Sequence, residues 1–93
     1  MGVVFRIYCK DLDDLTDCLK RLEKLRDHFP SKPAVRVENV LMHPDIVVDT
    51  VVERLADLHY LLEMMLTEFG AHKLSLEMPG PLRLEYVPAE EEG

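Results

Sequence analysis

Apolar and polar positions alternate at the start of the chain. Val3, Phe5, Ile7 and Cys9 fall on one side and the residues between them on the other. A period of two is the pattern of a half-buried β-strand, so we predict a strand over residues 3–9. The same alternation predicts three further strands, over residues 34–41, 74–78 and 82–86.

The segment after the first strand has its apolar residues at helical spacing. Asp11 stands where an N-cap is expected, and Asp14 follows three residues later in a capping-box-like arrangement. The apolar face extends from Leu12 to Phe29, and Pro30 predicts the end of the helix.

A second helix is predicted from Pro44, at its first turn, to about Phe69. Gly70 then provides a left-handed stop. The order is therefore β-α-β-α-β-β. Because each predicted strand has one apolar and one charged side, both helices should cover the same face of the sheet.

The predicted fold is thus α+β, a two-layer sandwich with two helices on one face of a four-stranded sheet. A ferredoxin-like βαββαβ order is the alternative, and it would require residues 35–42 to divide into two short strands. At 93 residues the chain has room for one domain. We place that domain at residues 1–88, followed by a disordered acidic tail over residues 89–93.

The second predicted helix has more apolar side chains than one buried seam requires. That seam comprises Val48, Val51, Leu55, Leu58, Leu62, Met65 and Phe69. Leu61 and Met64 lie off the seam and Tyr60 lies further round, so this half of the helix is apolar nearly all round and should need a partner. The predicted interface, most simply that of a two-fold homodimer, consists of Leu58, Tyr60, Leu61, Met64 and Met65.

Composition and charge narrow the class of protein. The chain is 47% hydrophobic and 31% charged, with a formal net charge of −7. It has no glutamine and one asparagine, an amide depletion typical of thermophile proteins. We expect no membrane span and no signal peptide, and hence a cytoplasmic protein. A negative overall field repels phosphate backbones, which makes a nucleic-acid partner unlikely on this evidence.

Metal and cofactor signatures are absent from the sequence. Cys9 and Cys18 are too few for a disulfide framework and lack metal-ligand spacing, so we predict two buried thiols. His59 and Glu63 are four residues apart, a spacing that can present two metal ligands, although a partly buried histidine bonded to a carboxylate is the commoner arrangement. We predict no metal, no cofactor and no catalytic residue.

Two other functions follow from particular residues. The run 11–16 resembles the nucleophile motif of haloacid-dehalogenase-type phosphotransferases, which implies Asp11 as nucleophile, Asp13 as acid/base and a bridging magnesium ion. It departs from that motif at Leu15, which stands at the threonine position. On the open sheet face, Arg6, Tyr8 and Arg36 are candidates for stacking on and tracking RNA.

The function that these patterns favour is a non-catalytic protein–protein interaction module. It would homodimerise or act as a small accessory subunit of a larger complex. The RNA-binding sheet and the Asp11/Asp13 phosphotransferase are the alternatives.

Overall fold

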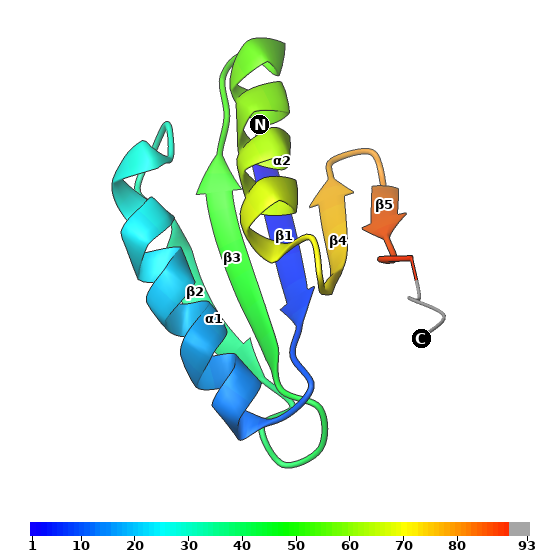
Figure 1. Ribbon diagram of the computed structural model, residues 1–93. Helices are drawn as coiled ribbons and strands as arrows, with labels where there is room; N and C mark the ends of the chain where they lie inside the picture. The colour runs from blue at the N-terminus through cyan, green and yellow to red at the C-terminus, as the bar shows by residue number, and fades with distance from the viewer. Residues whose placement is uncertain (90–93) are drawn as a thin grey trace.

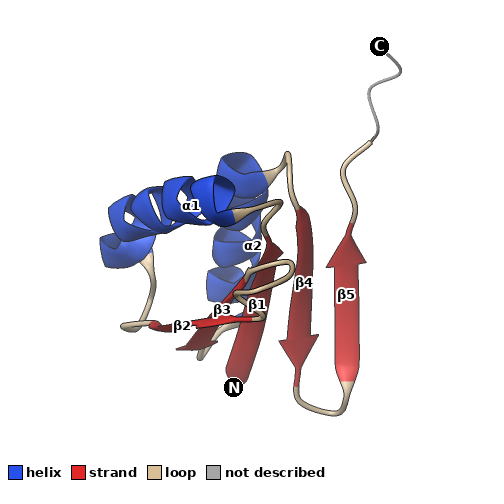
Figure 2. Ribbon diagram, turned by 90° about the horizontal axis from the view of Figure 1, so that it is seen from below, coloured by secondary structure: helices blue, strands red, loops and turns tan. Residues whose placement is uncertain are grey.

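The computed structural model describes residues 1–89 of the chain. It consists of two helices and a five-stranded antiparallel sheet with strand order β2-β3-β1-β4-β5 (Figure 1). Along the chain these are β1 (Gly2–Tyr8), α1 (Leu12–Leu25), a 3-10 turn (Arg26–His28), β2 (Ala34–Glu38), β3 (Asp45–Val51), α2 (Leu55–Phe69), β4 (Lys73–Met78) and β5 (Leu82–Tyr86). Both helices lie on one face of the sheet, so the predicted α+β class is confirmed (Figure 2).

The strand count and the element order differ from the prediction. The first six regular elements follow the βαββαβ order of ferredoxin-like folds, and β5 is added after them. In the sheet, β3 lies between β1 and β2, and β1 lies between β3 and β4. Each helix therefore connects two strands that are separated by a third strand.

The missed element is β3. Residues 45–51 were predicted as the start of a helix, but they pair with β1 on one side and with β2 on the other. Five of the seven are β-branched, which favours a strand. The alternation that reveals a strand is hidden because Ile46, Val47 and Val48 are all fully buried.

The turn before β3 explains why β2 is shorter than predicted. Asn39 adopts a left-handed conformation with φ of 55°, which ends β2 at Glu38. Pro44 does not begin a helix; it is buried, and its carbonyl accepts a hydrogen bond from the backbone N–H of Cys9 at 3.0 Å.

The N-cap of α1 is confirmed. Asp11 accepts a hydrogen bond from the backbone N–H of Asp14 at 2.8 Å, and Asp14 in turn accepts one from the N–H of Lys10 at 2.9 Å. At the other helix, Gly70 is not left-handed, since its φ is −64°. It is required by space instead: a Cβ there would lie 2.6 Å from the carbonyl oxygen of Leu66.

The core lies between the helices and the inner face of the sheet. The side chains that are nearly fully buried there are Val3, Phe5, Ile7, Cys18, Ile46, Val48, Val52, Leu61, Met65 and Phe69. The inward side of α2 is thus centred on Leu61 and Met65. The predicted seam was displaced because it was continued from Val48 and Val51, which belong to β3. As a result, two of its positions, Val51 and Leu55, are 51% and 79% exposed.

Two leucines of α2 test this placement. We expect Leu61→Ala to lower the free energy of unfolding by about 2–5 kcal/mol, because it leaves a cavity in the core. Leu55→Ala, on the same helix but exposed, should change it by less than about 0.5 kcal/mol. Urea denaturation measures both. Equal losses for the two variants would contradict the packing of α2.

Candidate functional site

The predicted interface residues do not form one external surface. Leu61 and Met65 are fully buried inside the protomer, so their prediction as contact residues is wrong. Leu58 and Met64 are partly buried against the same core, and Tyr60 is 50% exposed. The physical reason is the phase of α2: residues 45–51 belong to β3, the helix begins at Leu55, and its inward side is the one that carries Leu61 and Met65.

The uncovered apolar surface lies at β5 instead. In the register with β4, Leu82, Leu84 and Tyr86 pair with residues on the helix side of the sheet. These three side chains remain 60%, 53% and 39% exposed. Figure 2 shows the reason, since β5 stands beyond the two helices at the edge of the sheet.

A shallow apolar cavity joins this strand to α2. Its lining includes Leu62 and Leu66 of α2 together with Leu84 and Tyr86. The hydroxyl of Tyr86 donates a hydrogen bond to the carbonyl of Gly70 at 3.1 Å, which ties the end of β5 to the end of α2. We call Leu62, Leu66, Leu82, Leu84 and Tyr86 the β5 apolar surface.

The open face of the sheet brings together Arg6 and Arg36 with acidic residues. Arg6 is paired with Asp45 on the neighbouring strand β3 and crosses that strand to reach Glu38 on β2, at 3.0 Å each. Arg36 is paired with Glu38 and Asp49. Asp45 and Asp49 belong to β3, whereas the sequence had predicted a helix over these residues. Their carboxylates neutralise the two arginines that were candidates for RNA binding.

The pKa values of this network shift in the direction that the pairing requires. Burial by itself lowers the pKa of Arg6, but its hydrogen bonds to Glu38 and Asp45 raise it overall. Hydrogen bonds from Arg36 and Arg6 lower the pKa of Glu38. Both groups are therefore held in the charged state.

Tyr8 lies on the same face, two residues from Arg6 along β1 and opposite Asp45. The ammonium of Lys73 stands 4.8 Å from the centre of its ring, and Arg83 donates a hydrogen bond to its hydroxyl at 3.1 Å. Arg83 is also paired with Glu85 at 2.9 Å. The structure thus places Arg6, Tyr8 and Arg36 on one face, but protein groups already occupy the ring and both guanidinium groups.

The predicted phosphotransferase pair has other contacts. Asp11 uses a carboxylate oxygen to cap α1, and both Asp11 and Asp13 are exposed. The His59–Glu63 pair is present at 3.3 Å, but its side chains are 73% and 69% exposed rather than partly buried.

Sequence reasoning missed a cluster of polar side chains near the start of α1. Cys9 follows β1, Asp14 and Cys18 lie one turn apart on α1, and His72 lies between α2 and β4. The Nε2 atom of His72 is 2.9 Å from both carboxylate oxygens of Asp14 and 3.4 Å from the sulfur of Cys18. His72 is buried, although it lies in the short connection just before β4.

Burial dominates the chemistry of this cluster. It raises the pKa of Cys9 to about 11 and that of Cys18 to about 12, so neither thiol is a nucleophile at neutral pH. For Asp14, burial raises the pKa, but the hydrogen bonds from Lys10 and His72 outweigh it and lower the pKa overall. Both cysteines are free, as the prediction of two buried thiols required.

The cluster is also not a Cys-His-Asp triad. A triad uses one ring nitrogen of histidine for the nucleophile and the other for the carboxylate. Here Nε2 of His72 contacts both Cys18 and Asp14, whereas its buried Nδ1 has no hydrogen-bond partner among residues 1–89.

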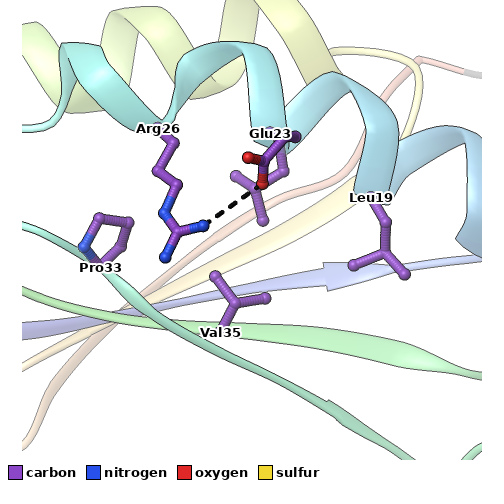
Figure 3. Close-up of a pocket in the computed structure, with 6 residues that line it drawn as sticks. Leu19, Glu23, Arg26, Pro33 and Val35 are labelled. Carbon is purple, nitrogen blue, oxygen red and sulfur yellow. Dashed lines mark ion pairs between the residues drawn. The ribbon is translucent and has the colours of Figure 1, made fainter.

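A further cavity, of about 240 Å³, lies between α1 and β2 (Figure 3). Leu19, Pro33 and Val35 line it, and the ion pair of Glu23 with Arg26, at 3.5 Å, lies beside them. Ligand sites in proteins usually have about 300–1,000 Å³ and several converging polar groups. The two charged groups here are paired with each other, so this cavity offers little to a small molecule.

These features define a small α+β two-layer sandwich with an exposed apolar edge strand. In comparisons with known proteins, no family model, no curated protein and no solved structure matches the chain. Among residues 1–89, no helix has the length and apolar character needed to cross a membrane.

The ion-pair network on the open face can be tested by stability. We expect Arg6→Met to lower the free energy of unfolding by about 3 kcal/mol, because it leaves the buried carboxylate of Asp45 without its charged partner. Arg83→Met, on the same face but exposed, should cost less than about 1 kcal/mol. Urea denaturation of both variants at neutral pH gives the comparison; a loss at Arg6 no larger than that at Arg83 would contradict it.

Proposed function

We propose that this protein is a non-catalytic protein–protein interaction module that forms a two-fold homodimer through β5. The observation that supports the proposal is the exposure of Leu82, Leu84 and Tyr86 on the helix side of an edge strand. An edge strand also carries backbone N–H and C=O groups directed away from the sheet, and another strand can pair with them.

The sequence of β5 is complementary to itself in an antiparallel pair. If Leu84 lies on the two-fold axis, Leu82 stands opposite Tyr86 of the partner subunit, and the apolar side chains meet on the helix side of the sheet. On the open side, Arg83 stands opposite Glu85 of the partner subunit. Each position therefore faces a residue of matching character, which favours a second copy over an unrelated strand.

The opposite edge of the sheet is less suited to this role. β2 is also five residues long, but of its two valines Val37 packs against the core and Val35, 42% exposed, lines the cavity beside α1. In β5, by contrast, the whole strand is exposed. The burial of apolar area is worth about 25 cal/mol per Å², so covering Leu82, Leu84 and Tyr86 is a favourable contribution to association.

The two alternative functions receive less support. RNA binding requires free cations and accessible aromatic rings, but Arg6 and Arg36 are paired with carboxylates and Tyr8 is in contact with Lys73. The phosphotransferase alternative requires Asp11 as nucleophile, and its carboxylate caps α1.

Light scattering coupled to size-exclusion chromatography tests the homodimer. We expect the wild-type chain to have the mass of a dimer at micromolar concentration, and Leu84→Lys to have the mass of a monomer, since it places two cations on the axis. The exposed Leu55→Lys on α2 is the matched control and should remain a dimer. A wild-type monomer at millimolar concentration would overturn the proposal.

A charge exchange tests the arrangement of the two strands. Arg83→Glu places two glutamates opposite each other on both sides of the two-fold axis and should weaken the dimer. The double variant Arg83→Glu/Glu85→Arg restores opposite charges and should recover it, with the dissociation constant measured by analytical ultracentrifugation. If the double variant is weaker than the single variant, the antiparallel pairing about Leu84 is wrong.

A further inference from the structure

The cluster of Cys9, Asp14, Cys18 and His72 combines four donor groups of the kinds that bind transition metals. The two sulfurs and a carboxylate oxygen of Asp14 lie within 4.8 Å of one another, and Nε2 of His72 contacts that carboxylate and the sulfur of Cys18. Zn²⁺ binds these ligand types, whereas Ca²⁺ and Mg²⁺ prefer oxygen alone. We propose that these four residues form a binding site for one divalent transition-metal ion of the Zn²⁺ type.

The distances from the sulfur of Cys18 to its two polar neighbours are close to those of a tetrahedral site. With bonds of about 2.3 Å to sulfur and about 2.0 Å to nitrogen and oxygen, neighbouring ligands lie about 3.3–3.8 Å apart. The sulfur of Cys18 is 3.4 Å from Nε2 of His72 and 3.9 Å from Oδ1 of Asp14. The donor atoms of Cys9, Asp14 and Cys18 all lie within 4.8 Å of one another.

Two separations have to change when an ion enters. The sulfur of Cys9 lies within 4.8 Å of the donors of Asp14 and Cys18 but outside that distance from His72, so rotation about its Cα–Cβ bond has to bring it closer to the imidazole. Nε2 of His72 lies 2.9 Å from Asp14, which is a hydrogen-bond distance. A metal ion between the two atoms requires about 0.4 Å more. The carboxylate can supply this by rotating about its terminal bond, since Asp14 is the residue of the four that is not fully buried.

The backbone already holds the ligands in place. The N–H of Cys9 donates to Pro44, the N–H of Asp14 donates to Asp11, and the N–H of His72 donates to Phe69, at distances of 2.8–3.0 Å. The ring of His72 also packs edge-on against Phe69, with 6.5 Å between the ring centres. Binding therefore requires little ordering of the chain, and such preorganisation favours affinity.

The surroundings of the cluster allow a metal ion to enter, and the charges of its ligands largely offset that of the ion. The side chain of Asp14 is 19% exposed, so an ion can reach the cluster past this carboxylate. On coordination each thiol releases its proton to solvent. The resulting two thiolates, one carboxylate and neutral imidazole place three negative charges around a doubly charged ion, leaving one net charge for the surrounding protein and solvent to stabilise.

Cobalt titration tests the site. The full chain is kept reduced, freed of metal with a chelator, and titrated with Co²⁺. We expect one equivalent to give a sulfur-to-cobalt charge-transfer band and the strong visible bands of tetrahedral cobalt, and one equivalent of Zn²⁺ to remove them. A spectrum of octahedral cobalt without the charge-transfer band would overturn the proposal.

Variants locate the ion. Cys18→Ser should abolish the charge-transfer band, and Asp14→Asn should weaken Co²⁺ binding by about 10–100-fold, since the loss of even an outer partner of a ligand has that effect. Asp14→Asn keeps a similar shape at a partly exposed position, so it addresses the case in which Cys18→Ser fails to fold. His59→Gln removes an exposed histidine outside the cluster and should leave binding unchanged. If Asp14→Asn binds as wild type does, or if His59→Gln weakens binding, the ion lies elsewhere and the proposal is wrong.

Discussion

The burial of β3 on both faces is the constraint on which the rest of the structure depends. On the helix side, Ile46 and Val48 pack in the core. On the open side, Val47 is fully buried as well, although that side has no helix. The apolar stem of Arg6 passes over β3 to reach Glu38, and a long charged side chain can cover an apolar neighbour in this way. The ion pairs thus act as the outer cover of a central strand.

This arrangement also explains which parts of the fold could be predicted from the sequence. In β1, α1, β4 and β5 the apolar residues recur on one side of the element, so their periodicity is plain even though β5 is exposed along its whole length, and all four were predicted close to their observed bounds. β3 has no solvated side, so it gave no alternation. Its β-branched residues were the remaining signal, and giving them more weight would have predicted the strand.

The error at β3 carried over to the candidate sites. Once residues 45–51 were taken as helical, the seam of α2 was drawn from the wrong starting point, and Leu61 was assigned to the outside. Asp45 and Asp49 were likewise assigned to a helix, so the acidic partners that they provide for Arg6 and Arg36 on the open face were missed. The Cys9, Asp14, Cys18 and His72 cluster could not be predicted at all, because its residues are adjacent only after the chain has folded.

The position of β5 has a consequence for how this protein can change. The elements before it already form a complete βαββαβ unit with its own core, and β5 is attached through a turn at Gly80, whose φ of 91° suits glycine. Substitutions in β5 need not disturb the packing of that unit. The proposed dimer contact at β5 and the core of the βαββαβ unit therefore lie in largely separate parts of one small chain, so β5 can diversify while the core stays fixed.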